Sequence, residues 1–354
     1  MSPFEQRQFS SSQVRKAGEL LRRAGESVSA EQLAEAEGVL DNFRALHAVP
    51  LNTFQATLRA RLRRLGIKDY IVAQRIKRKP TILDKLRHRE NDMMLDRMDD
   101  IGGIRAIVPN MADLRALADT YLAAGNRHKL KHKITKPRDY ITQPKASGYR
   151  GIHIAFRYHD GQRGRKDYEG LRIEMQLRTK LQHIWATAVE TFEAFMGEKF
   201  KSSQGSHEWL DFFALASSAF ACVEKQPLVP CHQGLSPEEI SARLRKMIKE
   251  LRVMEKMRGF TLAEKMLSSV KKGDKHALLV FDAKEKTASI RGYEESQYES
   301  AYANYLREER RSAGDDMRLV VLIRMASIEK FKKAYPNYCA DLEDFKRWLE
   351  KVSA

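Results

Sequence analysis

Leu171–Arg178, which reads LRIEMQLR, decides the fold of the segment around it. Apolar and polar residues alternate at every step, and side chains along a β-strand alternate between its two faces. One face therefore carries four apolar side chains, and the other carries Arg172, Glu174, Gln176 and Arg178. Such a polar row is costly to bury unless its members are paired. The row is either the solvated face of a half-exposed sheet, which is common, or the polar face of a site.

Strand-like and helix-like segments alternate on both sides of this strand. The expected strands are 70–77, 103–108, 129–135, 152–158 and 171–178, and the expected helices are 81–91, 111–125 and 179–197. This alternation predicts an α/β (α+β) domain with a mixed β-sheet flanked by helices.

The flanking regions are predicted to be mainly helical. Residues 11–66 show apolar side chains at three- and four-residue steps, with Pro50 and Gly66 as the expected helix ends. After a polar break near residue 200, helices are expected over 207–225 and 237–260, followed by a ββαβα module. We therefore divide the chain into an N-terminal helical region (1–69), a central domain (70–204) and a C-terminal extension (205–354) of unknown role.

Composition restricts the partners and the compartment. The formal net charge is +17, which favours anionic partners such as nucleotides or nucleic acid. The three cysteines fit neither a zinc pattern nor a disulfide framework, so we expect a reducing, cytoplasmic location. The sequence has no signal-peptide pattern and no apolar run of the roughly 20 residues that a membrane helix needs. We expect no membrane partner.

Two carboxylates are candidates for a metal site. Asp99 and Asp100 precede a predicted strand that begins with Gly102 and Gly103. Mg²⁺ in proteins usually takes one or two carboxylates together with phosphate and water oxygens. Asp100 and Glu174 would form such a pair. The alternative is an ordinary turn, since Asp and Gly are common turn residues.

Two basic segments could bind a nucleotide. The loop 138–153 combines aromatic and cationic side chains, which suits stacking on a base and pairing with phosphate, although a basic surface loop would look similar. Residues 75–89 carry a dense run of Arg and Lys around Pro80 and a predicted helix start, a favourable place for anions. A solvated basic helix face or a nucleic-acid patch are the alternatives.

The order of these motifs resembles the synthetase domain of the RelA/SpoT homologue family, the alarmone synthetases. The resemblance is carried by RIKRKPTILDK (75–85), DIGGIR (100–105), DYITQPKASGYRGIH (139–153), IEMQLRT (173–179) and WATAVETF (185–192). Two positions depart from the family pattern. Gly151 replaces a serine and Thr191 replaces a histidine, which puts the exact nucleotide preference in doubt.

The resemblance implies a nucleotidyltransferase-like fold that moves a diphosphate from ATP to the 3′-hydroxyl of GDP or GTP. It assigns Mg²⁺ to Asp100 and Glu174. It assigns the donor phosphates to Arg75, Lys77, Lys85 and Arg105, the acceptor to Lys145, Tyr149 and His153, and places Arg150, Gln176 and Arg178 in the same site.

Two other functions compete with this one. A toxin-like relative that diphosphorylates the 3′ end of tRNA would share the donor site, and the charge of +17 favours it. A non-enzymatic RNA-binding protein is a weaker alternative, because Asp100, Glu174 and Tyr149 are retained. The stretch before residue 70 is too short for the metal-dependent hydrolase of the long family members, so we expect a synthesis-only member. Small members often form homo-oligomers, which the sequence neither requires nor excludes.

Overall fold

The computed structural model of the chain forms two compact units. One comprises Met1–Ile141 with Gly151–Lys180, and the other comprises Thr142–Arg150 with Leu181–Ala354. The structure describes residues 5–24, 28–89, 93–123, 132–159, 161, 166–196, 200, 205–266, 270–271, 273–282, 287–312, 318–325 and 338–354. The boundary drawn from the sequence at residue 204 lies outside the described residues and stays a prediction.

The first unit contains a five-stranded mixed sheet with the order β1-β2-β5-β4-β3. The strands are β1 (Ile71–Ile76), β2 (Gly102–Val108), β3 (Lys133–Asp139), β4 (Ile152–Arg157) and β5 (Arg172–Thr179). β2 and β5 run parallel, and the other neighbours are antiparallel. The predicted mixed sheet is therefore confirmed. β3 lies later than the expected strand over 129–135, because Lys136–Asp139 pair with the first half of β4.

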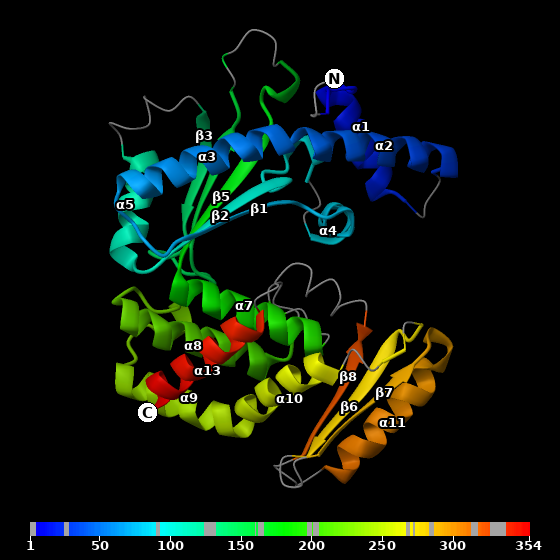
Figure 1. Cartoon of the computed structure of the whole chain (residues 1–354), viewed down its shortest axis with the longest axis vertical. Coiled ribbons are helices and arrows are strands. Elements are labelled where there is room, and N and C mark those ends of the chain that lie inside the picture. Colours follow the sequence, from blue (N-terminus) through cyan, green and yellow to red (C-terminus); the bar gives the residue numbers. More distant parts are fainter. Residues whose placement is uncertain are drawn as a thin grey trace. The chain divides into compact units, whose positions relative to one another are not determined.

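The helices of the first unit are α1 (Ser11–Arg22), α2 (Ala30–Leu46), α3 (Ala48–Arg64), the short α4 (Lys79–Asp84) and α5 (Met111–Leu122). Of these, α3 and α5 pack on the sheet (Figure 1). α3 packs on β1 and β2, and α5 packs on β2 and β5. Pro50 does not end a helix, as the sequence suggested, but lies in the first turn of α3. Proline is tolerated there because amide groups of the first turn have no partner within the helix.

The alternation predicted for β5 is confirmed. Ile173, Met175 and Leu177 are fully buried in the core of the first unit. Glu174 and Gln176, on the opposite face, are only partly buried. The sheet therefore has one face built into the core and one face that bears polar groups.

The second unit has a helical core. Its helices are α7 (Lys180–Met196), α8 (His207–Glu224), α9 (Pro237–Glu250), α10 (Val253–Met266) and α13 (Tyr338–Ser353). Phe192 of α7 contacts Trp209 and Phe213 of α8 and Phe260 of α10. These shared contacts explain why α7 groups with the C-terminal extension rather than with the strand before it. The single helix expected over 237–260 is interrupted, because Arg252 has a positive φ of 52° that a right-handed helix does not accommodate.

A second sheet follows, with β6 (His276–Asp282), β7 (Thr287–Tyr293) and β8 (Arg318–Arg324). Its order is β7-β6-β8, all antiparallel, and α11 (Tyr298–Arg311) packs on β6 and β8. The order β6-β7-α11-β8-α13 matches the ββαβα order expected from the sequence, but α13 packs with the helices α8, α9 and α10. Within the described part of the chain, no helix is both long and apolar enough to cross a membrane.

Candidate functional site

The strand directions of the first sheet bring Lys77 to Asp100. β1 and β2 are antiparallel, so Lys77, just after β1, lies beside the residues just before β2. The Lys77 amide donates to the Ile101 carbonyl at 2.8 Å, and its Nζ donates to Asp100 Oδ2. Nζ of Lys85, at the start of a π-helical turn (Lys85–Arg89), is 3.6 Å from Asp100 Oδ1. Two of the predicted donor-site cations therefore surround one predicted metal ligand.

The two carboxylate oxygens of Asp100 have different surroundings. Its Oδ1 is buried and accepts no hydrogen bond from the described residues. Burial lowers the pKa of Lys77, and although the Asp100 charge opposes this effect, the neighbouring Lys85 and Arg75 charges add to it. The local surplus of positive charge suits an anionic phosphate group.

Glu174 is the second carboxylate of the site. His153 Nδ1 donates to Glu174 Oε1 at 3.0 Å, and Gln176 Nε2 donates to Oε2 at 2.8 Å. Burial by itself would raise the pKa of Glu174, but the hydrogen bonds and charges of His153, with smaller contributions from Gln176 and Lys85, lower it to about 2. Glu174 is thus ionised throughout the physiological pH range. Since Lys85 acts on both carboxylates, they share one electrostatic environment.

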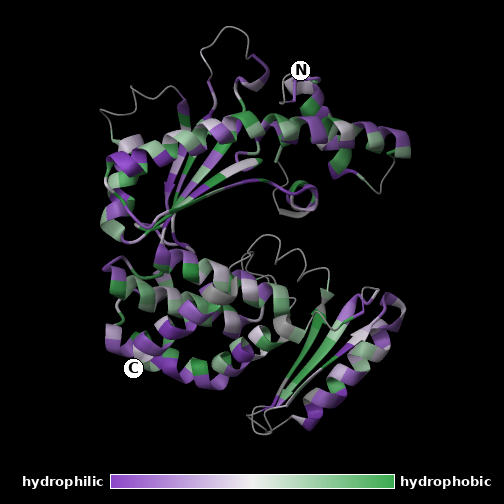
Figure 2. Cartoon of the chain, in the orientation of Figure 1, coloured by the Kyte–Doolittle hydropathy of each residue, from purple (hydrophilic) through white to green (hydrophobic). Residues whose placement is uncertain are grey.

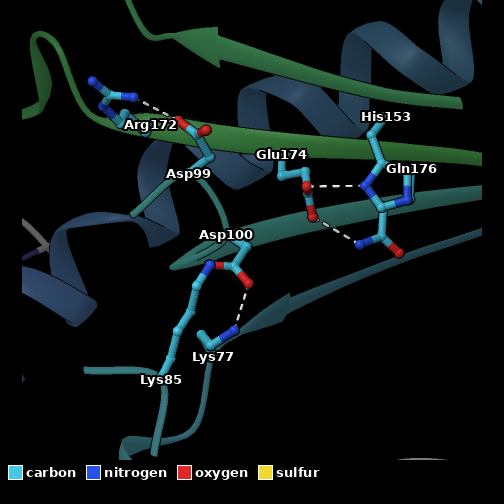
Figure 3. A network of polar contacts seen from close by, with 8 residues as sticks. All are labelled: Lys77, Lys85, Asp99, Asp100, His153, Arg172, Glu174 and Gln176. Atoms are coloured by element: carbon cyan, nitrogen blue, oxygen red, sulfur yellow. Dashed lines mark hydrogen bonds and ion pairs between the residues drawn. The ribbon is translucent and has the colours of Figure 1, made fainter. Parts of the chain in front are cut away.

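Figure 3 shows Asp100 in the turn before β2 and Glu174 on the neighbouring β5, with Lys77 bonded to Asp100 and with His153 and Gln176 bonded to Glu174. Small residues leave room beside Glu174. Its neighbours across the sheet are Gly103 on β2 and Ala155 on β4. A Cβ added at Gly103 would meet its nearest atoms, both of Arg75, at 3.8 Å, an ordinary contact distance. The polar face is therefore open at this point.

The other predicted residues of the sheet lie around this opening. Arg75 of β1 is opposite Gly103, and Arg105 of β2 is opposite Gln176. Arg178 is almost fully buried, and its Nη2 donates to Gln176 Oε1 at 3.4 Å. The predicted sheet residues thus form one continuous polar surface.

Sequence reasoning missed the partner of Asp99. Because β2 and β5 are parallel, their first residues are adjacent, and Arg172 Nη1 donates to Asp99 Oδ1 at 2.6 Å. Asp99 is therefore tied to the sheet while Asp100 faces the lysines. The position of Arg172 at the start of the polar row of β5 was the available signal.

The loop residues belong to the second compact unit. Thr142–Arg150 groups with the helical unit, whereas His153 lies on β4 in the first. Nζ of Lys145 is 5.4 Å from the centre of the Tyr149 ring. Arg150 is buried, and its Nε donates to Ser217 Oγ at 3.0 Å. The structure thus brings Lys145 and Tyr149 together in one unit and the carboxylates together in the other.

The carboxylates Asp100 and Glu174 fit a magnesium ion whose other ligands are phosphate and water oxygens. No group of three or more His, Cys, Asp and Glu side chains able to hold a metal occurs among the residues the structure describes. Asp100 and Glu174 supply two carboxylates, and Oδ1 of Asp100 lacks a hydrogen bond from the described residues. Mg²⁺ commonly binds in this way, with phosphate oxygens and waters completing its octahedron.

Comparison with known proteins finds a family match in this part of the chain. Residues 74–194, about a third of the chain, match the model of a region found in RelA/SpoT proteins. This RelA/SpoT region contains the carboxylates, the cations of the polar face and the loop 142–150.

Two curated relatives are similar over about a third of this chain. A probable chloroplastic GTP diphosphokinase, RSH3 of Arabidopsis thaliana, is 32% identical over 126 residues, which are 35% of this chain and 15% of the relative. The GTP pyrophosphokinase YjbM of Bacillus subtilis is 29% identical over 118 residues, 33% of this chain and 52% of the relative. The chain therefore spans at most about half the length of these relatives.

Solved structures are similar with a lower sequence identity. Small alarmone synthetase 1 of Bacillus subtilis, solved with its product pppGpp, is 20% identical with a TM-score of 0.43. The similarity covers 52% of this chain and 93% of that one.

Proposed function

We propose that this chain is a nucleotide pyrophosphokinase that transfers a diphosphate from ATP to the 3′-hydroxyl of GDP or GTP, forming the alarmone (p)ppGpp. The observation that carries the proposal is the pair Asp100, in the turn before β2, and Glu174, on the neighbouring β5. Lys77, Lys85 and Arg75 flank this pair. The names of the relatives support a GTP diphosphokinase activity.

The reaction needs charge neutralisation and alignment more than covalent help from the protein. The 3′-oxygen of the acceptor attacks the β-phosphorus of ATP, forming one O–P bond. The bond between that phosphorus and the oxygen bridging to the α-phosphorus breaks, and AMP leaves. A Mg²⁺ held by Asp100 and Glu174 would stabilise charge on the phosphate oxygens.

The side chains around the carboxylates take complementary roles. Lys77, Lys85, Arg75 and Arg105 bind the phosphates of ATP. His153 and Gln176 fix the orientation of Glu174 through its two oxygens. The ionised Glu174 can also accept a hydrogen bond from the attacking hydroxyl. We assign the acceptor base to Tyr149 and an acceptor phosphate to Lys145, because an aromatic ring and a cation lie together in that loop.

A second candidate acceptor is the 3′ end of tRNA. The net charge of +17 favours a nucleic-acid acceptor. Both acceptors use the same donor chemistry, so they are distinguished only by the molecule that receives the diphosphate. We propose the cytoplasm as the location, where both acceptors are present.

One assay tests the proposal. The protein is incubated with Mg²⁺ and ATP labelled at the β-phosphate, together with GDP, GTP, ATP or bulk tRNA, and the labelled products are resolved. Label in GDP or GTP supports alarmone synthesis, and label in tRNA supports the second candidate. Absence of transfer to all four acceptors by folded protein would refute both. Glu169→Gln is a matched control for Glu174→Gln, since Glu169 is a half-exposed carboxylate that pairs with His159.

A further inference from the structure

Ser217 of α8 contacts the loop that carries Lys145 and Tyr149. Its Oγ donates to the carbonyl oxygen of Gly148 at 2.5 Å and accepts from Nε of Arg150 at 3.0 Å. The Ser217 hydroxyl therefore donates one hydrogen bond to the residue before Tyr149 and accepts one from the residue after it. Ser217 is buried, so water does not readily replace these bonds.

The backbone at Gly148 is shaped to fit against α8. Its φ is +88°, a conformation that side chains with a Cβ rarely adopt. A Cβ at this position would lie 2.8 Å from Cβ of Ser217, 3.0 Å from Cζ2 of Trp185 and 3.1 Å from Cα of Ala214. The turn that precedes Tyr149 is thus packed closely against α8, with no space for a side chain.

α7 holds α8 in place beneath the loop. Nε1 of Trp185 donates to the carbonyl oxygen of Phe213 at 2.9 Å. Within the loop, the Gly148 amide donates to the Lys145 carbonyl at 2.9 Å. Lys145 and Tyr149 consequently belong to a tight turn whose support is the helix pair α7 and α8.

Arg150 adds a buried charge to this support. Burial lowers the pKa of Arg150 to about 10, although the charge of Glu224 on α8 opposes the effect. The cavity beside Arg150 has a volume of about 10 Å³, enough for about one water molecule. Burial and the bond to Ser217 make Arg150 part of the support of the loop, and its predicted place in the acceptor site stays a prediction.

We propose that Ser217 is a positioning residue that holds loop 142–150 in its acceptor-binding conformation, so that α8, outside the RelA/SpoT region, contributes to acceptor binding. This proposal rests on the proposed function. Truncation at residue 204 would remove Ser217, so the C-terminal extension would not be separable from acceptor binding.

The neighbouring Ser218 provides a matched control. It is also buried on α8, but its Oγ lies 2.9 Å from Nδ1 of His232 and accepts from the Val229 amide at 3.3 Å. Ser217→Ala and Ser218→Ala both remove a buried hydroxyl that makes two hydrogen bonds. Only the first removes bonds to the loop. Their difference separates loop positioning from a general loss of stability.

The test compares wild-type, Ser217→Ala, Ser218→Ala and Tyr149→Ala in the full-length protein. Calorimetric titrations with GDP and with a non-hydrolysable ATP analogue give the two dissociation constants. Kinetic assays give the two KM values, and hydrogen exchange reports the protection of amides in 142–150. For Ser217→Ala we expect about tenfold weaker GDP binding, the loss of roughly one strong hydrogen bond, and faster loop exchange. ATP binding should change less than about twofold.

The pattern of results decides the proposal. Ser217→Ala should resemble Tyr149→Ala in its acceptor defect, while Ser218→Ala retains wild-type GDP binding and loop protection. Equal effects of Ser217→Ala and Ser218→Ala on GDP binding and loop exchange would overturn the proposal, as would equal losses of GDP and ATP affinity. If wild-type protein binds no GDP and transfers to no acceptor, the proposed function fails. The loop-exchange comparison then still decides whether Ser217 holds the loop.

Discussion

The two sheets of this protein use their faces differently. In the first sheet, β5 alternates between buried apolar residues and the polar row of Glu174 and Gln176. In the second sheet, β6 is apolar along most of its length (Figure 2). Leu278 packs in the cluster with Tyr293 and Ala301, whereas Leu279 packs in the helical core. One sheet thus has an available polar face, and the other has apolar contacts on both sides.

This difference indicates where chemistry can be placed. A polar row is stable only on a face that is not filled by apolar packing, because unpaired polar groups are costly to bury. The first sheet keeps such a face, and its parallel β2–β5 pair aligns two strand starts with the residues before them. In the second sheet, apolar packing occupies both sides of β6. The following predictions test that contrast, from the largest expected effect to the smallest.

Removing either carboxylate of the first sheet should abolish transfer. We expect Asp100→Asn and Glu174→Gln each to lower the rate at least about 100-fold, since a metal-ligand charge is lost where phosphate charge develops. Circular dichroism should show an unchanged fold, and Glu169→Gln should keep wild-type activity. A residual rate above about a tenth of wild type, a loss below about 1.4 kcal/mol, would exclude the metal role.

A polar group in the second sheet should instead damage stability. Leu279→Gln places an amide in a fully buried apolar position, and we expect a loss of about 3 kcal/mol in the free energy of unfolding. The reciprocal change Gln176→Leu removes the hydrogen bond to Glu174 on the polar face of the first sheet. It should lower transfer and change stability by less than about 1 kcal/mol. Urea titrations of both variants provide the comparison, and similar stability losses would remove the distinction between the sheets.

A buried histidine on the covered side of the first sheet should make the stability of the protein depend on pH. His47 is fully buried between α2 and α3, and burial lowers its pKa to about 4 from an ordinary value of 6.5. Between these values the unfolded chain binds a proton that the folded chain does not, so stability falls as the pH decreases. The difference between the folded and unfolded pKa values of His47 lowers the free energy of unfolding by about 2 kcal/mol from pH 7.5 to pH 5. Urea unfolding at both pH values measures it, and His47→Leu should show a correspondingly smaller decrease. Identical pH dependence in the two proteins would contradict a buried neutral His47.

The smallest effects concern two adjacent glycines that face opposite sides of the first sheet. A Cβ at Gly102 would lie 2.6 Å from Cδ1 of Ile173 and 3.1 Å from Cδ2 of His47, whereas Gly103 has space. We expect Gly102→Ala to lower the free energy of unfolding by about 1–2 kcal/mol and Gly103→Ala to leave it nearly unchanged. Thermal unfolding measures both changes.

A larger substitution should separate stability from activity at this position. Gly103→Val should retain the fold but impair transfer, since its side chain would project beside Glu174. Normal activity in folded Gly103→Val would show that the space over Gly103 is not used.

Much of the first unit was predictable because its patterns are local. The alternation in 171–178 predicted β5 and its polar row, which the structure confirms. The turn before β2 singled out Asp100, whose pairing with Glu174 in a metal site stays a prediction. The partner of Asp99 was missed, because Arg172 reaches it only through the parallel pairing of β2 and β5. The break at Arg252 was missed because the apolar periodicity continues through the position where the backbone takes a positive φ.

The sequence by itself determined which side chains belong to each strand face and which residues carry the family motifs, because both depend on spacing along the chain. Only the tertiary structure decided that Lys77 and Lys85 share Asp100, that His153 and Gln176 hold Glu174, and that Ser217 holds the loop at Gly148 and Arg150. These contacts join residues separated in the chain. They form through strand register and helix packing, which bring distant groups together only in the folded protein.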